Sequence, residues 1–255
     1  MYASLNLSQN SKTSFFPDHK NTFGLMFGLP ENGGTCPGAT EGKGGCLEII
    51  KTGSGTERRT CYMDKVVRIY PNAGKTLVNN TMLLRDKTEE EMVVILRNTV
   101  LKWLLNGGYK AQYFRLHYSG DFFSEAYARA WRKVISEFPN TNFWVYTRSF
   151  DTSRSPYINV IPIIAECKNL AVYLSCDQVN YKVAMREVLE WNNVGLAFMG
   201  NDIPEELSAA KKFVQCPEIT KKIKNTKDAG ACSKCKLCFT HNAKIKLRNI
   251  QFKIH

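Results

Sequence analysis

The sequence predicts an α/β protein built on a parallel sheet, and three observations support this fold class. Short apolar runs alternate with amphipathic helical segments at regular spacing between residues 113 and 210. No glycine fingerprint of a dinucleotide-binding fold accompanies them, so a partial (β/α) barrel is expected as readily as an open sheet. Seven of the nine cysteines lie outside this alternation, in one group on each side of it.

Apolar runs with strand character are bounded by turn residues along most of the chain. The strands are predicted at residues 23–29, 113–117, 142–147, 170–175 and 194–199. A capping box at Thr88 opens a long helix that glycines stop at Gly107, and Ser124 caps the next helix. Further helices are predicted at residues 62–70, 183–191 and 205–210.

Composition divides the chain into three regions. Residues 1–22 are polar and are expected to form an N-terminal arm, and residues 23–210 form the α/β domain with a cysteine loop at 30–61. Residues 211–255 form a basic, cysteine-rich metal-binding extension packed on that domain. No secretory signal opens the sequence and no apolar run is long enough to span a membrane, so the sequence predicts a cytoplasmic protein without a membrane partner. Nine cysteines in a reducing cytoplasm favour metal ligation over disulfides.

Four cysteines near the C-terminus form the strongest metal-binding pattern. Cys232, Cys235 and Cys238 follow one another with two residues between them, and Cys216 precedes a proline sixteen positions upstream. Thiolates at that pitch converge on one cation, and a third cysteine in the run, with a remote cysteine before proline, favours an iron–sulfur cluster. Zinc, which usually takes two separate Cys-x-x-Cys pairs, is the alternative metal.

A glycine-rich loop from Pro30 to the start of the first long helix carries Cys36, Cys46 and Cys61. A long loop without regular structure tends to be functional, and its glycines let backbone amides approach a cluster closely. Three protein ligands would leave one corner of a 4Fe–4S cluster open, whereas four would close it. One or two clusters are therefore expected.

Positive charge is concentrated at the C-terminal end. Between Lys211 and His255, 12 lysines and arginines stand against 2 acids, within a net charge of +12 for the whole chain. These cations can offset the negative charge of a cluster, or they can track a phosphate backbone, and both interpretations stay open. Phe213, Phe239 and Phe252 are interleaved with the cations, as in proteins that bind single-stranded nucleic acid.

Polar residues gather where the predicted strands end, and the cysteine loop also follows a strand. Since chemistry in parallel α/β folds sits at the carboxyl ends of the strands, loop and polar residues are expected at the same edge. The polar residues of this set are His117, Ser119, Asp121, Thr147, Arg148, Ser175 and Asp177. His117 with Asp121 lacks the companion motifs of a metallophosphatase, so that reaction is disfavoured.

Several motifs, taken in order, resemble the phage "gene product 88" family over nearly the whole chain. They are Thr-Cys36-Pro-Gly-Ala, Arg115-x-His-x-Ser-Gly-Asp-Phe, Tyr146-Thr-Arg-Ser, and the final Cys-Pro with Cys-x-x-Cys-x-x-Cys. The resemblance implies a phage or mobile-element origin, and hence the cytoplasm of a host cell. It carries no established activity.

The architecture also resembles radical S-adenosylmethionine enzymes, in which a cysteine loop after the first strand holds a cluster with one open iron. The tight Cys-x-x-x-Cys-x-x-Cys of those enzymes is replaced here by the spread Cys36, Cys46 and Cys61. The resemblance implies that residues at the strand ends bind S-adenosylmethionine and that the C-terminal cysteines hold an auxiliary cluster. The cofactor-binding residues it implies are Ser119, Gly120, Asp121, Thr147, Ser175 and Asp177.

Two functions follow from these features. The first is a phage-encoded, radical-SAM-like redox enzyme with an open N-terminal cluster, a four-cysteine auxiliary cluster and an electron donor protein as partner. The alternative is a nucleic-acid-binding protein of phage replication or host takeover, stabilised by an iron–sulfur cluster or by zinc.

Overall fold

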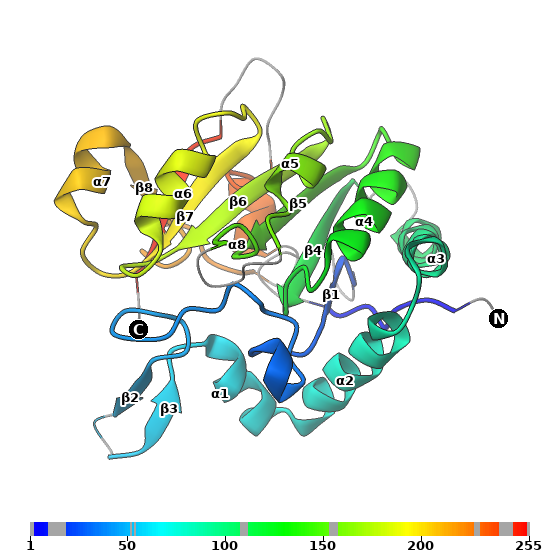
Figure 1. The fold of residues 1–255 in the computed structure, drawn as a ribbon, viewed down its shortest axis with the longest axis horizontal. Helices are drawn as coiled ribbons and strands as arrows, with labels where there is room; N and C mark the ends of the chain where they lie inside the picture. The colour runs from blue at the N-terminus through cyan, green and yellow to red at the C-terminus, as the bar shows by residue number, and fades with distance from the viewer. Residues whose placement is uncertain are drawn as a thin grey trace.

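A seven-stranded parallel sheet forms the centre of the computed structural model (Figure 1). The structure describes residues 3–9, 19–51, 53, 55–107, 112–152, 158–226, 230–239 and 247–253. The strand order is β1-β4-β5-β6-β7-β9-β8, and each pair of neighbours is parallel, which confirms the predicted α/β class. The strands are β1 (Thr22–Gly24), β4 (Tyr113–Ser119), β5 (Asn142–Thr147), β6 (Leu170–Cys176), β7 (Val194–Met199), β8 (Phe213–Gln215) and β9 (Asn249–Phe252).

Helices connect most of these strands, and their starts follow the expected capping chemistry. The Thr88 hydroxyl accepts from the Glu91 amide while the Glu91 carboxylate accepts from the Thr88 amide, and Ser124 accepts from the Tyr127 amide. No helix in the described ranges is both long and apolar enough to cross a membrane. The helices are η1 (Pro30–Asn32), α1 (Tyr62–Ile69), α2 (Pro71–Arg85), α3 (Glu89–Gly107), α4 (Glu125–Glu137), α5 (Ile161–Ile164), α6 (Tyr181–Glu187), α7 (Glu205–Ala210) and α8 (Ala231–Cys235).

The winding of the sheet places the helices on one face. Strands β4, β5, β6 and β7 are neighbours in chain order, so each right-handed crossover moves in the same direction and leaves its helix on the same side. Figure 1 shows α4, α5 and α6 together in front of the sheet and α8 behind it. From β4 to β7 the sheet winds in one direction, as in a (β/α) barrel, but the chain then reverses to insert β9 between β7 and β8, with α8 on the opposite face.

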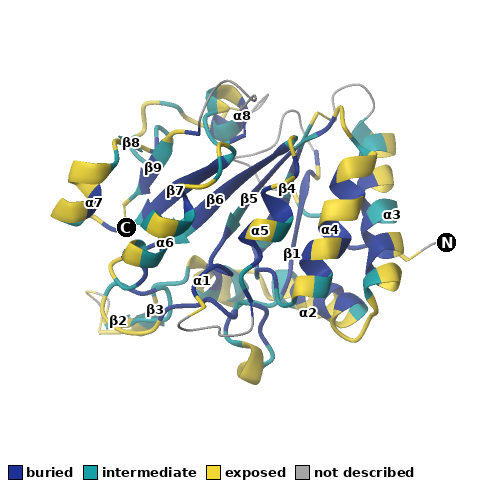
Figure 2. Cartoon of the chain, turned by 45° about the horizontal axis from the view of Figure 1, so that its top comes forward, coloured by how far each residue is buried: buried dark blue, intermediate teal, exposed yellow. Residues whose placement is uncertain are grey.

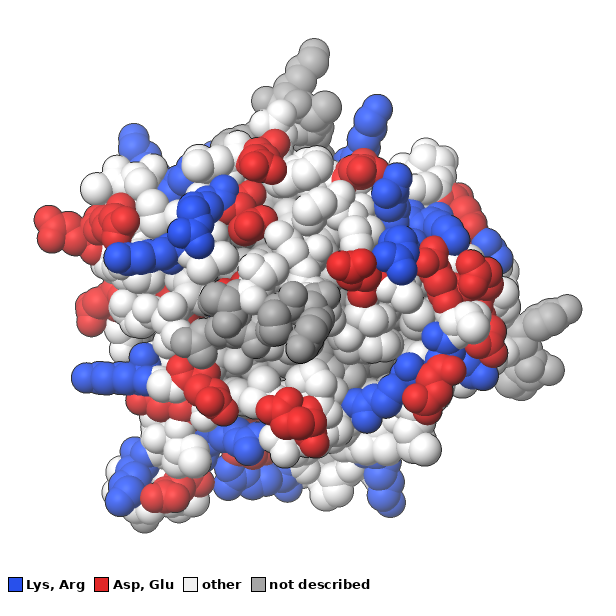
Figure 3. Space-filling view, viewed as in Figure 1, with Lys and Arg blue, Asp and Glu red and all other residues white. Residues whose placement is uncertain are grey.

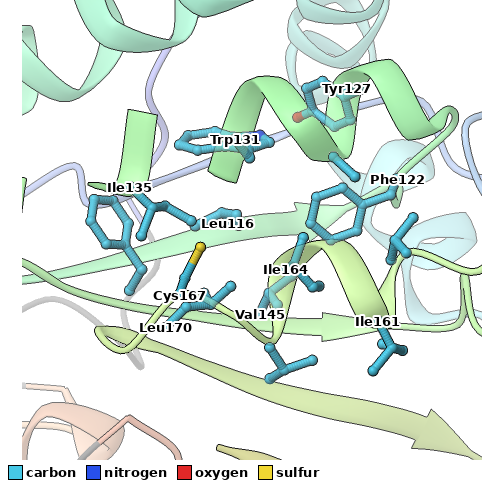
Figure 4. Packing of buried hydrophobic residues seen from close by; sticks show 14 of the residues in the cluster. Leu116, Phe122, Tyr127, Trp131, Ile135, Val145, Ile161, Ile164, Cys167 and Leu170 are labelled. Carbon is cyan, nitrogen blue, oxygen red and sulfur yellow. The ribbon is translucent and has the colours of Figure 1, made fainter. Parts of the chain in front are cut away.

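The alternation of side chains along the strands creates two apolar clusters, one on each face. On the helix-bearing face, Trp131 and Tyr127 of α4 pack against Leu116 and Val145 of the sheet (Figure 4). Cys167 lies in this cluster and Cys176 is fully buried, as expected for small core side chains. On the opposite face, Trp144, Tyr173 and other strand residues pack against the segment that carries the C-terminal cysteines. Figure 2 shows that the strands are buried between the helices on one face and the C-terminal segment on the other.

Three elements differ from the sequence-based expectation. The first strand is only Thr22–Gly24, because the chain bends towards η1 after Gly24 instead of continuing to residue 29. The cysteine loop contains an antiparallel hairpin of β2 (Ile49–Lys51) and β3 (Glu57–Arg59). The basic C-terminal region is not only an extension, because it supplies β8 and β9 to the central sheet.

Candidate metal centre

The hairpin of β2 and β3 explains how three widely spaced cysteines come together. Its register pairs Ile49 with Arg59, and continuing that ladder brings the Cys61 amide to the Cys46 carbonyl at 2.8 Å. The fourteen residues between these cysteines are therefore folded back on themselves. The charges of Cys46 and Cys61 both act on Cys36, so the three thiols share one neighbourhood, called here the rim group.

A buried ion pair anchors this loop to the carboxyl ends of the strands. The Arg148 guanidinium, which follows β5, donates to the Asp177 carboxylate at 2.6 Å and to the Thr40 hydroxyl at 2.9 Å. Thr40 in turn donates to Asp177 at 2.6 Å and accepts from the Cys46 amide at 3.0 Å. Thr40, Arg148 and Asp177 are all buried, and we call them the polar clamp. The clamp confirms that the cysteine loop lies at the predicted edge of the sheet.

Two glycines let the loop approach the strand ends closely. A Cβ at Gly38 would overlap the carbonyl oxygen of Arg148, so the loop backbone lies directly on the end of β5. Gly120 has φ +78°, a left-handed conformation that glycine adopts without strain, and a Cβ there would overlap the Thr35 hydroxyl. These contacts give a steric reason for glycine at both positions.

Asp121 is the hub of the turn after β4. Its carboxylate accepts from the Thr147 hydroxyl at 2.7 Å, the Arg148 amide at 2.6 Å and the Phe122 amide at 2.8 Å. Burial raises the pKa of Asp121 to about 6, although these hydrogen bonds oppose the rise. The Asp121 amide donates to Thr35 Oγ1 at 3.2 Å. Asp121 and Thr147 therefore hold the cysteine loop, and their contact with S-adenosylmethionine stays a prediction.

The other residues predicted to bind a cofactor also lie at or near the carboxyl ends of the strands. The Ser119 hydroxyl donates to the Leu25 carbonyl at 2.9 Å, which ties β4 to the chain after β1. Asp177 belongs to the polar clamp, and its other carboxylate oxygen accepts from the Val179 amide at 2.9 Å. Ser175 lies half-buried on the sheet face opposite the helices. All six predicted residues lie at the strand ends beside the rim group or on the adjoining sheet face.

The rim thiols lie in a largely dry environment next to a fixed positive charge. Burial raises the pKa of Cys36 well above the usual value, and the nearby Asp121 charge raises it further. Burial likewise raises the pKa of Cys61, while the Arg148 charge opposes the rise. Burial tends to lower the pKa of Arg148, but the charges of Cys46 and Asp177 outweigh it and raise that pKa. Arg148, although paired with Asp177, thus also favours the thiolate form of Cys61.

The other four predicted ligands line a single pocket on the opposite face of the sheet. Cys216 follows β8, and the remaining three come from α8 and the turn after it. Apolar residues form most of the rest of the wall, including Phe239, which packs on Trp144 at a ring separation of 4.5 Å. We call Cys216, Cys232, Cys235 and Cys238 the module group.

Electrostatics at the module group differ from those at the rim. Burial raises the pKa of Cys238 to about 12, and a hydrogen bond from the Tyr146 hydroxyl opposes the rise. The charges of Cys216, Cys232 and Cys235 act on Cys238 as well, which places all four thiols close together. The thiolate form of Cys238 is therefore disfavoured unless a cation is bound nearby.

The spacing of the sulfurs that a site requires depends on the kind of metal it holds. Zinc at about 2.3 Å from four sulfurs would hold those sulfurs only about 4 Å apart. Among the described residues, no three His, Cys, Asp or Glu side chains are arranged to hold a single metal ion. A cubane cluster inserts its own iron and sulfide between the cysteines and therefore needs them further apart.

Sequence reasoning missed three supporting residues. Thr40 is part of the polar clamp, and the Tyr146 hydroxyl forms a hydrogen bond with Cys238. Arg115 places its guanidinium 5.3 Å from the centre of the Tyr146 ring. The only signal in the sequence was that Arg115 and Tyr146 each begin one of the motifs quoted above, which stand in order with the cysteine motifs. Arg148 was noted as a strand-end residue, but its burial could not be foreseen.

Comparison with known proteins places these residues in a family. The model of the family described as "Gene product 88" matches residues 4–241. The "Gene 88 protein" of Mycobacterium phage L5 is 31% identical over 215 residues, covering 83% of this chain and 81% of the phage protein. The "Gene 88 protein" of Mycobacterium phage D29 is 30% identical over 217 residues, with the same coverage. No solved structure matches the chain. The chain therefore belongs to the gene product 88 family.

Proposed function

We propose that this protein is an iron–sulfur redox enzyme of the radical-SAM-like type, with its reactive site at the rim group and an auxiliary cluster at the module group. The observation that carries the proposal is the division of seven cysteines into a set of three at the strand ends and a set of four in an apolar pocket. Three protein ligands leave a coordination position open for a small molecule, whereas four close the site.

The residues around the rim group fit such a cluster in charge and in access to a ligand. Arg148 supplies a buried positive charge beside Cys46 and Cys61, which favours the thiolate forms that bind iron. Cys36 lies within the electrostatic reach of Asp121, so a molecule on an open iron would meet the Ser119–Asp121 turn. An iron–sulfur cluster there would supply a single electron and an open coordination site.

The one-way winding of the sheet also supports the radical-SAM-like comparison. A partial (β/α) barrel leaves its inner face free of helices and places loops at the carboxyl ends of its strands. Here the helices α4, α5 and α6 cover one face, and the two cysteine groups occupy the rim and the other face. S-adenosylmethionine is the cofactor class that this arrangement suggests for the open position.

The test is metal and sulfide analysis of protein purified without oxygen. We expect iron and acid-labile sulfide, with the rim share lost in Cys36→Ala and the module share lost in Cys235→Ala. Cys167→Ser is the matched control, because Cys167 packs in the helix-side core away from both groups. Zinc without sulfide would contradict the proposal. Reduced protein that cleaves S-adenosylmethionine would support the radical-SAM-like part, and a loaded protein that leaves it intact would contradict that part.

Nucleic-acid binding is the second candidate, and exposed cations favour it. The described part of the C-terminal segment 211–239, called here the module, carries Lys211, Lys212, Lys221, Lys222, Lys224, Lys234 and Lys236. Glu218 is the only acidic residue among the described positions 211–239. The face seen in Figure 3, by contrast, carries interspersed charges of both signs.

The aromatic part of this second candidate is weaker. Phe239 is 1% exposed and packs on Trp144, and Phe213 packs against Phe198, so neither ring is positioned for base stacking. Binding would then rest on phosphate contacts, and the affinity for single-stranded DNA would fall steeply with salt. Absence of binding at low salt would remove this candidate.

A further inference from the structure

The sheet face opposite the helices is covered over only part of its area. Trp144, Ala171 and Tyr173 are buried beneath the module that carries the four cysteines. Towards the carboxyl ends of the strands, the same face is only half-buried. The half-buried residues there are Tyr146, Ser175, Met199 and Phe252. This strip of the face lies between the rim group and the module group.

Arg115 of β4 projects over this strip without a counter-charge. Its Cζ lies 5.3 Å from the centre of the Tyr146 ring, and its Nε is buried without a hydrogen-bond partner. Among the described residues, Arg115 forms no ion pair, whereas the buried Arg148 is matched by Asp177. An unsatisfied buried donor on a charged group is costly, so a missing acceptor is expected at this position.

Two tyrosines near Arg115 are each linked to one of the cysteine groups. Tyr62 directly follows Cys61 and exposes 56% of its surface, and its hydroxyl lies within the electrostatic reach of Arg115. On the other side, the Tyr146 ring lies under Arg115 while its hydroxyl bonds Cys238. Arg115 therefore lies near one tyrosine from each of the two cysteine groups' surroundings.

We propose that Arg115, together with the Tyr62 hydroxyl, forms a binding site for the carboxylate or phosphate group of a small molecule. A guanidinium presents a rigid fork of donors that matches an oxyanion, and a phenol adds one further donor. The half-buried strip gives the rest of the molecule an aromatic and apolar surface to lie on. A neutral or cationic ligand would leave the guanidinium without a counter-charge.

The site is defined by residues that ligate no metal, and it stands independently of the metal content. Its role as the substrate site of an iron–sulfur enzyme rests on the proposed function. A molecule anchored at Arg115 would extend from there towards the rim group, where Tyr62 is the neighbour of Cys61. The substrate class that follows is a small acid or a phosphate ester with an aromatic or apolar part.

Arginine modification tests this site in the full-length protein. Phenylglyoxal reacts with accessible arginines, and mass spectrometry of peptides gives the rate at each position. The rates are compared in inorganic phosphate, in acetate and in chloride at matched ionic strength. Arg97 and Arg129 are internal controls, because both are partly exposed and paired with glutamates. Iron and sulfide are measured on the same sample.

We expect phosphate or acetate, but not chloride, to slow the modification of Arg115 several-fold and saturably, without a selective effect on Arg97 or Arg129. The anion that protects at lower concentration identifies the preferred group. Equal rates in all three salts, or an Arg115 that never reacts, would overturn the proposal. If Arg115 only balances the charge of the cysteine groups, Arg115→Gln loses metal while neither anion protects the wild-type residue, and that result also overturns it. Protection in a sample without iron would contradict the proposed function and leave this site standing.

Discussion

The rim group and the module group use the same ligand atom but rest on different supports. The rim cysteines are held through buried polar contacts, in which Arg148 is bound to Asp177 and Thr40. The module cysteines are held by apolar packing, in which Phe239 lies on Trp144, and by one hydroxyl from Tyr146. A site with a fixed counter-charge can change charge at low cost, whereas a site in apolar surroundings favours one charge state. The contrast agrees with a reactive rim and a structural or electron-storing module.

The largest expected effect comes from removing the acid of the polar clamp. Asp177→Ala leaves the Arg148 guanidinium buried without its partner, which costs about 3–5 kcal/mol of unfolding free energy. We expect the rim share of iron to be lost and the module share to be kept, as measured by urea unfolding and iron per chain.

Glu137→Ala is the control for this variant, since it breaks only the partly exposed pair with Arg97. Its expected cost is about 0–1 kcal/mol. Equal loss of iron from both groups in Asp177→Ala would show that the two supports are not independent.

Acidification should destabilise the fold through His117, which is buried and bonded to the Tyr127 hydroxyl at 2.8 Å. Burial lowers the pKa of His117 to about 3 from its usual 6.5, with the Arg115 charge as the second cause. The unfolded chain therefore binds the extra proton first, and stability is lost as the pH falls below about 6.5. The loss is about 3 kcal/mol by pH 4. His117→Gln should show a shallower decline in urea unfolding over this range, and parallel pH profiles of the two proteins would contradict the assignment.

A methyl group at Gly38 should affect the rim group and not the module group, through a steric clash alone. Gly38→Ala forces the loop off the Arg148 carbonyl, at an expected cost of about 1–3 kcal/mol, with weaker iron retention at the rim. Gly53→Ala, in the hairpin turn, is the matched control because a Cβ there meets nothing within 4 Å. Similar melting temperatures for the two variants would argue against the close approach.

The smallest expected effect concerns the module. Tyr146→Phe removes the hydroxyl that bonds Cys238, at about 1 kcal/mol, and should leave iron at the rim unchanged. Tyr181→Phe, which loses only a long 3.4 Å contact with Glu206, serves as the control in the same denaturation series. An effect of Tyr146→Phe on the rim alone would reverse the proposed separation.

Local sequence patterns predicted the regular core well. The strands at 142–147 and 194–199 and the helix at 205–210 have the bounds found in the structure, because apolar alternation and flanking turn residues are strong there. Helix α2 was not predicted, since Pro71 and Gly74 obscure its pattern, although Pro71 is well suited to a helix start. The hairpin of β2 and β3 was missed because its strands are three residues each and their outer faces are exposed.

The candidate site was predictable in its ligands but not in its supports. Cysteine spacing indicated the module group directly, because three of its members follow one another with two residues between them. The proximity of Cys46 to Cys61 depends on a hairpin, and the role of Arg148 depends on a partner 29 positions away. Such long-range contacts leave no periodic signal in a single sequence. The strands β8 and β9 were missed for the same reason, since their pairing joins segments separated by the whole module.

The insertion of β9 between β7 and β8 has a consequence for biosynthesis. Among the described residues, strand β8 pairs only with β9, and the four module cysteines lie on the connection between these two strands. During synthesis, the connection leaves the ribosome before β9 does. The cysteines are therefore exposed before β9 has completed this edge of the sheet. Under the proposed function, stable metal binding by the module group is expected only after β9 has left the exit tunnel and paired with β7 and β8.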